Sequence, residues 1–398
     1  MRHVKRMLEA SKRRQHLTLD LPPAMPGCVW VHACSVGEVG SVAFLVRRLL
    51  DEHQRVHLTV VTRTGFAHAR RLLGERVSIS YLPWDMPGLM RRFVARLRPR
   101  MLLLVETEFW PGMLRACARQ GVKVVGVNTR ISDRSFPRYQ ATRWFWRRLL
   151  AGVHLFLPQG KLDAERLVRI GVDPERIGPA GNLKFAVQPP RVDAQVLRRR
   201  LDPSAQRPIL LLASTHEDEE ARLLRMLPTW LDQCPTLLPV FVPRHPERFA
   251  RVAELIESHG FRLHRWTEGA VVAAPDVVLL DAMGVLAGLY TVADLVFIGG
   301  SLVDVGGHNP LEAAVCGRGV LTGPYVQNFR EIMALLTEHE AAIRCANEDE
   351  VAATMSRLLS HPQELACLHA AAAEVMQHRR DAVDRVVGCV LAQVGQGG

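Results

Sequence analysis

The sequence predicts an α/β protein made of two Rossmann-like halves whose parallel sheets face a central cleft. Three observations lead to this prediction. Short apolar runs alternate with amphipathic segments from residue 28 onward, as is typical of buried parallel strands covered by helices. A proline-containing stretch at residues 187–207 interrupts this alternation, which then starts again. The chain has 398 residues, enough for two domains of ordinary size.

Each predicted element follows from its own pattern. In the first half, apolar runs predict strands at residues 28–32, 56–62, 77–83, 101–108, 122–128 and 153–158, and amphipathic segments such as 41–53 and 90–97 predict helices between them. In the second half, strands are predicted at 208–215, 237–243, 261–266, 277–281, 295–300 and 319–324, followed by a mostly helical segment after Asn328. We therefore expect an N-terminal domain at 1–186, a linker at 187–207 and a C-terminal domain at 208–398.

Composition limits the class of function. The net charge of +11 suggests acidic partners, such as phosphorylated substrates, nucleic acid or an anionic membrane surface. None of the eight cysteines has CxxC spacing, so neither a zinc site nor a disulfide framework is predicted, and a reduced, cytoplasmic setting fits. The sequence contains no run of about 18 apolar residues that would predict a transmembrane helix. Its basic N-terminus lacks the apolar core of a signal peptide.

Polar residues follow the predicted strands, at the edge where open parallel sheets bind ligands. After the strand at 28–32, the sequence Ser-Val-Gly-Glu places Glu38 at the start of a helix. This glutamate suits a general base that takes a proton from a hydroxyl nucleophile. The spacing of Ser35 and Glu38 also matches a capping box, which would make the glutamate purely structural. Both interpretations remain open at this point.

Two further strand ends carry charged residues. Glu106 and Glu108 end the most apolar strand of the first half, where one carboxylate can bind a cation or orient a substrate and the other can be solvated. Arg244 and His245 come directly after a strand of the second half, and the arginine suits a phosphate or carboxylate partner. The alternative for Arg244 is an ordinary surface arginine. No acidic pair is convincingly placed for Mg²⁺, and no histidine cluster has zinc spacing.

A glycine-rich loop at 299–307 leads into a predicted helix that opens with Asn-Pro-Leu-Glu. Pro310 is well placed at the first helical position, and a glycine loop before a helix N-terminus is typical of an anion site. A phosphate bound there, with Glu312 on ribose hydroxyls, is one interpretation. The other is a capping box between Asn309 and Glu312.

Taken together and in order, these motifs resemble those of the 3-deoxy-D-manno-octulosonic acid (Kdo) transferase family. The resemblance runs from about Trp30 to about Asn328 and rests on WVHACSVGE, TRTG, ETEFWPGML, NTRISDRSF, GNLKF, STHEDEE, VPRHPERF, DAMGVLAGLY, ADLVFIGGSLVDVGGHNPLEAA and TGPYVQNF. It implies the GT-B glycosyltransferase fold and an inverting transfer of Kdo from CMP-Kdo to a phosphorylated lipid A precursor in lipopolysaccharide biosynthesis.

The resemblance also assigns residues. Glu38 is similar to the family's catalytic base, and Glu108 and Lys184 are similar to its proposed transition-state stabilisers. The positions that resemble its CMP contacts are Arg244, His245, Met283, Gly284, Val285, Asn309, Pro310, Leu311 and Glu312. No metal and no cofactor other than the donor are implied, because cationic side chains and a helix N-terminus can stabilise the departing phosphate. Two departures, Ala186 where Asp is general and Asp218 where Gly is common, remove no proposed catalytic group.

The family usually begins with an apolar membrane-anchoring helix, which this sequence lacks. We therefore expect a peripheral protein on the cytoplasmic face of the bacterial inner membrane, or an N-terminal anchor missing from the sequence. Residues 134–152 mix tryptophan and phenylalanine with arginines, and the N-terminal 14 residues are basic, so both segments could contact an anionic surface. A buried helix with an arginine-rich solvent face is the alternative for 134–152.

Two other functions compete with Kdo transfer. The first is a different GT-B nucleotide-sugar transferase, which would turn over a donor such as UDP-GlcNAc instead of CMP-Kdo. The second, from charge alone, is a non-catalytic protein that binds acidic lipid or nucleic acid. Such a binder has no use for Glu38, Glu312 and the glycine loop, and no RNA-binding signature is present, so nucleic acid is not an expected partner.

Overall fold

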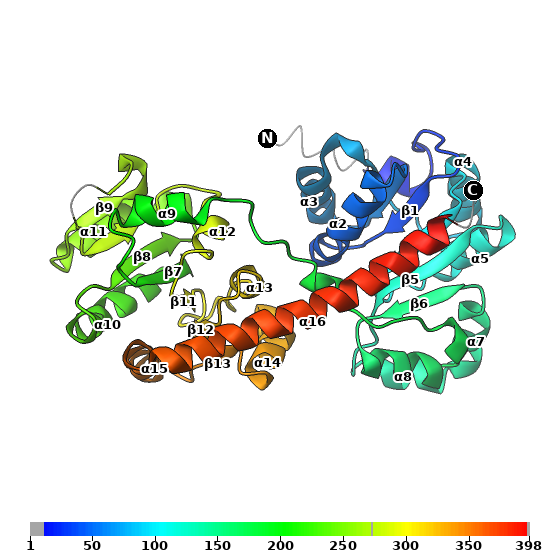
Figure 1. The fold of residues 1–398 in the computed structure, drawn as a ribbon. Coiled ribbons are helices and arrows are strands. Elements are labelled where there is room, and N and C mark those ends of the chain that lie inside the picture. Colours follow the sequence, from blue (N-terminus) through cyan, green and yellow to red (C-terminus); the bar gives the residue numbers. More distant parts are fainter. Residues whose placement is uncertain (1–11, 272–273, 396–398) are drawn as a thin grey trace. The chain divides into compact units, whose positions relative to one another are not determined.

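The computed structural model describes residues 12–271 and 274–395 (Figure 1). Contacts divide this part of the chain into two compact units. Unit 1 contains the described residues up to Ala186 together with those from Arg379 onward, and unit 2 is Val187–His378. Each unit has its own parallel sheet, which confirms the predicted α/β class with two Rossmann-like halves.

The sheet of unit 1 has six parallel strands in the order β3-β2-β1-β4-β5-β6. The strands are β1 (Val29–His32), β2 (Val56–Val60), β3 (Ser78–Tyr81), β4 (Met101–Val105), β5 (Lys123–Thr129) and β6 (Leu155–Pro158). Nearly all strand residues are buried, which explains why the strands are rich in apolar residues, although buried polar side chains such as His57, Thr59 and Ser80 interrupt β2 and β3. From β1 the chain adds strands toward one side of the sheet as far as β3, and from β4 it adds them toward the other side. The strand order therefore reverses between β1 and β4, and ligands of such sheets bind at this point.

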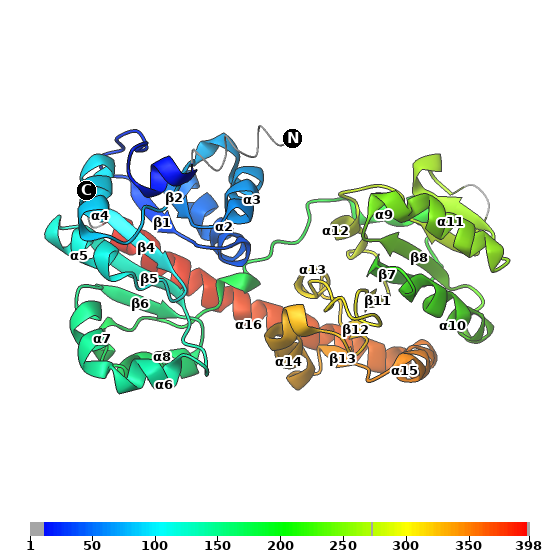
Figure 2. The same ribbon diagram turned by 180° about the vertical axis from the view of Figure 1, so that it is seen from behind.

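The helices of unit 1 pack on this sheet through one apolar face each. They are α2 (Val36–Asp51), α3 (Arg63–Leu73), α4 (Pro87–Leu97), α5 (Pro111–Arg119), α6 (Phe136–Ala141), α7 (Arg143–Leu150) and α8 (Lys161–Arg169). Their buried residues join those of the strands in one core that contains Trp30, Phe93 and Phe156. Helices α7 and α8 lie beside β6 at one end of the sheet in both views (Figures 1 and 2).

Unit 2 has a seven-stranded parallel sheet in the order β13-β12-β11-β7-β8-β10-β9. The strands are β7 (Ile209–Thr215), β8 (Leu238–Pro243), β9 (Leu263–Arg265), β10 (Val277–Leu279), β11 (Leu295–Ile298), β12 (Val320–Thr322) and β13 (Ala342–Arg344). The helices are α9 (Ala194–Leu201), α10 (Glu219–Gln233), α11 (Phe249–Ser258), α12 (Leu286–Leu289), α13 (Leu311–Ala314), α14 (Arg330–Glu338), α15 (Glu348–Ser360) and α16 (Pro362–Gly395).

The ends of unit 2 differ from the predicted boundaries. The predicted linker 187–207 contains α9 and belongs to unit 2, where Arg198 pairs with Asp294 at 3.1 Å. At the other end, α16 begins in unit 2, but its residues from Arg379 onward group with unit 1. A Cβ on Gly181 would lie 2.7 Å from the carbonyl of Ala382, so only glycine permits this close packing of α16 within unit 1. Within the described residues, no helix is both long and apolar enough to cross a bilayer.

Candidate active site

The candidate acids of unit 1 meet at the carboxyl edge of its two central strands. Strands β1 and β4 are neighbours, with His32 paired to Leu104 at their ends. Glu38 lies in the first turn of α2, directly after β1, and Glu108 lies three residues beyond β4. Parallel strands end at the same edge, so the topology places both glutamates at the point where the strand order reverses.

Glu38 makes capping interactions and still has the properties of a base. Its Oε1 accepts from the Ser35 hydroxyl at 2.9 Å and its Oε2 accepts from the Cys34 N–H at 2.7 Å, while its own N–H donates to Ser35 Oγ at 3.4 Å. Ser35 therefore caps the helix as predicted, but Glu38 accepts from the Cys34 N–H instead of the Ser35 N–H, so only part of the predicted capping box is present. Burial raises the pKa of Glu38 to about 7. The hydrogen bonds from Cys34 and Ser35 lower this pKa, and the charges of nearby Glu108 and Glu106 raise it by a smaller amount. A carboxylate has about four acceptor positions, so two remain for a substrate hydroxyl.

Glu108 is coupled to Glu38 through Cys34. The Cys34 thiol donates to Glu108 Oε2 at 2.8 Å, and the indole N–H of Trp110 donates to the same oxygen at 2.6 Å. The fully buried His32 lies behind this pair, with its Nε2 3.4 Å from Cys34 Sγ. Burial lowers the pKa of His32 to about 4, so the imidazole is neutral near pH 7. Sequence reasoning missed His32 and Cys34, although both follow the same pattern as Glu38, since they lie at the end of β1.

Lys184 lies on a short 3₁₀ turn, η3 (Leu183–Phe185), that packs against α2. The amide oxygen of buried Asn128, at the end of β5, accepts from the Leu183 N–H at 3.0 Å and fixes this turn. The structure thus brings the segment of Lys184 beside the helix that carries Glu38. Among the described residues, neither glutamate forms an ion pair with the Lys184 side chain, so its role rests on the resemblance alone.

A second group of candidate residues gathers at the carboxyl edge of the unit 2 sheet. Arg244 and His245 follow β8, and the Arg244 N–H donates to the Thr215 carbonyl at the end of β7 at 3.0 Å. The rings of His245 and His216 are 5.3 Å apart. His216 in turn stacks on His308, with their Nε2 atoms 2.8 Å apart. Sequence reasoning did not select His216 and His308, because no motif spacing links positions 92 residues apart.

Glu312 belongs to the same group. Burial raises its pKa, while the side-chain hydrogen bond from Asn309 and the charge of Arg244 oppose this shift, which places Glu312 near both groups. The Asn309 amide donates to Glu312 at 3.4 Å and its oxygen accepts from the Leu311 N–H at 3.1 Å, so part of the predicted cap is present. The helix α13 has only four residues and begins one residue after Pro310. Because a macrodipole needs several aligned turns, this helix stabilises an anion less than the sequence led us to expect.

The segment Met283–Val285 lies between β10 and α12. Met283 is 60% exposed, and Gly284 has a φ of 82°, a conformation that favours glycine. These positions present an open, apolar surface rather than hydrogen-bonding side chains.

The first part of the glycine loop is held by a buried carboxylate. Three of its N–H groups, from Gly300, Ser301 and Leu302, donate to the carboxylate of Glu219 at 2.7–3.1 Å. The Glu219 carboxylate also accepts from the His216 N–H at 3.1 Å, and the residue is fully buried. These loop donors are therefore satisfied within the protein and are not free for a phosphate. Glu219 lies in the first turn of α10, but its carboxylate accepts from loop residues 81 to 83 positions away.

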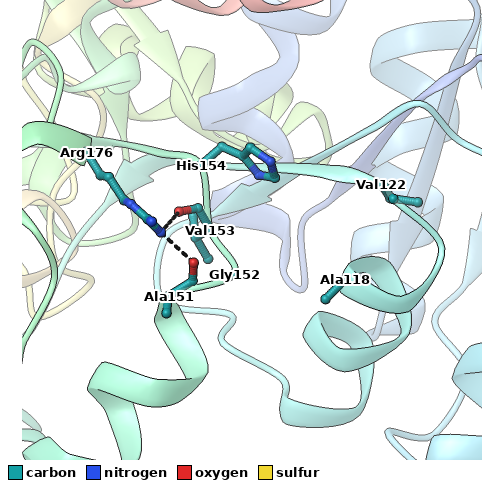
Figure 3. Close-up of a pocket in the computed structure, with 8 residues that line it drawn as sticks. Ala118, Val122, Ala151, Gly152, Val153, His154 and Arg176 are labelled. Carbon is teal, nitrogen blue, oxygen red and sulfur yellow. Dashed lines mark hydrogen bonds between the residues drawn. The ribbon is translucent and has the colours of Figure 1, made fainter.

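An open cavity of about 410 Å³ lies elsewhere in unit 1 (Figure 3). It is lined by Ala118, Gly121, Val122, Ala151, Gly152, Val153, His154 and Arg176. The Arg176 guanidinium is held there by the carbonyls of Ala151 and Val153 (Figure 3). Apart from Arg176, the lining residues lie in segments that precede β5 and β6, so the cavity lies at the amino edge of the sheet, opposite the candidate carboxylates.

Known proteins identify the family. Residues 4–187 match the family model described as 3-deoxy-D-manno-octulosonic-acid transferase. The 3-deoxy-D-manno-octulosonic acid transferase of Haemophilus influenzae is 32% identical over 375 residues, which cover 92% of this chain and 86% of that protein. This chain belongs to the Kdo transferase family. The Kdo transferase of Bordetella pertussis is 34% identical over 351 residues, covering 86% of this chain and 81% of that protein. The chain is therefore a glycosyltransferase that transfers Kdo.

Solved structures agree with the fold of this Kdo transferase. A UDP-N-acetylglucosamine 2-epimerase superposes with a TM-score of 0.57 at 13% identity, covering 94% of this chain and 97% of that chain. The UDP-GlcNAc 2-epimerase from Neisseria meningitidis gives a TM-score of 0.55 at 10% identity, covering 88% of this chain and 99% of that chain. Identities this low show the fold alone, and they confirm the GT-B class predicted from the sequence. The placement of the two sheets about a common cleft stays a prediction.

Proposed function

We propose that this Kdo transferase uses CMP-Kdo as donor and a phosphorylated lipid A precursor as acceptor, with inversion at the anomeric carbon and with Glu38 as the base. The observation that supports the proposal best is the environment of Glu38. This carboxylate is 9% exposed, has a pKa of about 7, and lies beside Glu108 at the point where the strand order reverses. A base with a pKa near the working pH is the most effective in general catalysis.

In the proposed reaction, an acceptor hydroxyl attacks the anomeric carbon of Kdo as its proton passes to the Glu38 carboxylate. The bond between that carbon and the phosphate oxygen of CMP breaks, and CMP leaves with the electron pair. Positive charge develops on the sugar in the transition state, and the proposed role of Glu108 is to stabilise it. Lys184 and Arg244 supply positive charge, and on this proposal the reaction requires no metal and no organic cofactor. Within unit 2, Arg244 and Glu312 are the proposed contacts to phosphate and ribose.

A direct assay tests the proposal. Purified protein is incubated with CMP-Kdo and a tetraacyl lipid A precursor, and the products are resolved by mass. We expect a product heavier by one or more Kdo units, together with free CMP. A parallel reaction with UDP-GlcNAc should give no sugar transfer. Turnover of UDP-GlcNAc without turnover of CMP-Kdo would contradict the proposed donor.

The proposed nucleotide contacts make a first prediction. Glu312→Ala and Arg244→Ala should each weaken CMP binding by roughly 1–3 kcal/mol, because a hydrogen bond to a charged group is lost. Isothermal calorimetry with CMP measures this change. Unchanged affinity in both variants would place the nucleotide elsewhere. Thermal unfolding provides the control, since a lower stability of Glu312→Ala with unchanged CMP affinity would assign Glu312 to capping with Asn309.

The proposed acceptor is a lipid, so the protein must reach a membrane surface. We name the exposed residues of α7 the docking patch: Arg143, Trp144, Arg147 and Arg148. Trp144 is 75% exposed, whereas Trp146 packs on Tyr139 with ring centroids 4.5 Å apart and belongs to the edge of the core. Of the aromatic residues predicted to contact the membrane, Trp144 is therefore the main one that is exposed. The N-terminal residues Arg2, Lys5 and Arg6 lie outside the described residues, and Lys12, Arg13 and Arg14 complete the second basic segment.

The docking patch makes a second prediction, that the protein binds anionic liposomes reversibly. Each basic group near such a surface contributes about 1 kcal/mol, and Trp144 adds apolar insertion at the interface. Binding should weaken as salt rises, because screening shortens the range of the attraction. Trp144→Ala should lower activity on the lipid acceptor more than it lowers CMP affinity. Trp146→Ala serves as the matched control, since Trp146 packs in the protein and its loss should lower the stability of the protein more than its binding to liposomes.

Cosedimentation with anionic and neutral liposomes across a salt series measures the binding. Equal partitioning to both lipids at all salt concentrations, or no binding to either, would rule out docking through this patch.

A further inference from the structure

The end of β1 and the segment after β4 bring three metal-ligating side chains together in unit 1. We propose that His32, Cys34 and Glu108 bind a soft divalent cation of the zinc class, and that this cation inhibits transfer by occupying Glu108. The binding site follows from geometry alone. The inhibition rests on the proposed function, because it assumes that Glu108 acts in the transition state.

The distances suit a tetrahedral ion with an open fourth position. The Cys34 Sγ lies 3.4 Å from His32 Nε2 and 2.8 Å from Glu108 Oε2, and His32 Nε2 lies 4.0 Å from Glu108 Oε2. With zinc bonds of about 2.0–2.3 Å, ligand atoms of a tetrahedral site lie about 3.3–3.8 Å apart. Shifts of roughly half an ångström at the two flexible side chains, Cys34 and Glu108, would bring all three atoms into this range.

Outer hydrogen bonds orient the ligands in the way that metal sites require. The Nδ1 of His32 faces the Thr59 hydroxyl at 2.9 Å and the Thr59 carbonyl at 3.2 Å. A carbonyl only accepts, so Nδ1 carries the proton and the lone pair of Nε2 points at Cys34 and Glu108. The indole of Trp30 donates to the same Thr59 hydroxyl at 2.8 Å and fixes it. The ring of His32 is thus held in the tautomer and orientation of a ligand.

Access and charge also favour a cation. His32 forms the buried floor of the cluster, while the side chain of Glu108 is 22% exposed and Cys34 is half-buried, so an ion can enter from solvent. Glu38, which accepts from the Cys34 N–H, adds a further carboxylate beside the site. Cys34 binds metal as thiolate, so the thiol proton that now lies toward Glu108 Oε2 is released to solvent when the ion binds.

Binding would change the chemistry of this edge of the sheet. Glu108 Oε2 would become a metal ligand and could no longer stabilise positive charge on the sugar. Sequence spacing did not suggest this site, because His32 and Cys34 lie 74 or more residues before Glu108, and only the pairing of β1 with β4 joins them.

The test measures metal binding apart from activity. Four proteins are first freed of metal with a chelator: wild type, Cys34→Ser, Glu108→Gln and Cys367→Ser. Each is then titrated with ZnCl₂, followed by calorimetry, and with CoCl₂, followed by absorption. Cys367 is exposed and lies in unit 2, so it is the control thiol. We expect a thiolate-to-cobalt charge-transfer band in wild type and Cys367→Ser and none in Cys34→Ser. Zinc should bind about tenfold or more weakly to Cys34→Ser and to Glu108→Gln.

The possible outcomes are distinct. The same band and affinity in all four proteins would assign the metal to another cysteine and overturn the site, as would the absence of a band in wild type. In the transfer assay, zinc should inhibit wild type and Cys367→Ser more strongly than Cys34→Ser. Zinc that binds at Cys34 without slowing wild-type transfer would refute the inhibition. If the chelated enzyme transfers no Kdo while the cobalt band appears, the proposed function fails and the metal site stands.

Discussion

Glu38→Gln should lose Kdo transfer by about 100-fold or more, while CMP affinity stays within twofold of wild type. The reason is that glutamine has the size of glutamate but cannot take a proton from the acceptor hydroxyl. Glutamine can keep both hydrogen bonds of this position, accepting from the Cys34 N–H and donating to Ser35 Oγ. Steady-state transfer and CMP calorimetry measure the two quantities. Turnover close to that of wild type would show that Glu38 is only a helix cap.

The pKa of Glu38 gives the same residue a second signature. Transfer requires the ionised carboxylate, so the wild-type rate should rise with pH through about 7 and then level off. Stability should change in the opposite direction. The folded pKa lies above the unfolded value, so the folded state binds more protons between about pH 4.5 and 7, and stability falls as pH rises through that window. At pH 8, Glu38→Gln should therefore unfold at the same or a higher temperature than wild type.

Ser35→Ala is the matched control for the cap. It removes the N-cap side chain of α2 but leaves the Glu38 carboxylate in place. We expect a loss of about 1 kcal/mol in stability and a much smaller change in rate than Glu38→Gln produces. A larger rate loss in Ser35→Ala than in Glu38→Gln would mean that helix geometry, not proton transfer, limits the reaction.

The architecture could be predicted from the sequence because buried parallel strands are rich in apolar residues. The segments that became β1 and β4 needed no knowledge of their partners to be recognised. Strand β13 was not predicted, because it is three residues long and only partly buried at the edge of its sheet. The domain limits were harder to predict, since nothing in the local pattern of α16 reveals that Gly181 allows its last turns to pack with unit 1.

The position of a candidate residue could be predicted only where it follows from the local sequence. Glu38 follows a central strand, and that position alone indicates the ligand-binding edge. The contact between Cys34 and Glu108 depends instead on the lateral order of β1 and β4, which the sequence does not specify. Glu219 has the local pattern of an ordinary first-turn acid, and its role depends on backbone N–H groups 81 to 83 residues away.

Glu219→Ala should destabilise unit 2 by roughly 3–5 kcal/mol. Four N–H groups would lose their acceptor, three of them in the glycine loop, and each buried unsatisfied donor costs about 1–3 kcal/mol. Removal of a buried carboxylate offsets part of this loss, since burial already raises the pKa of Glu219. Glu219→Gln keeps one acceptor oxygen and should fall between Ala and wild type. Urea unfolding, followed with and without CMP, measures the change.

Because of the position of this loop, the Glu219 variants should also bind CMP more weakly. The loop anchored by Glu219 leads directly to His308 and Asn309, so its loosening should weaken CMP binding even under conditions where unit 2 remains folded. Glu217→Ala is the control, because Glu217 is an exposed acid in the same segment and its loss should change stability by no more than about 0.5 kcal/mol. Equal urea midpoints and equal CMP affinities of Glu219→Ala and Glu217→Ala would contradict this prediction. They would mean that the N–H groups of the loop find other acceptors and that the loop keeps its conformation without the buried carboxylate.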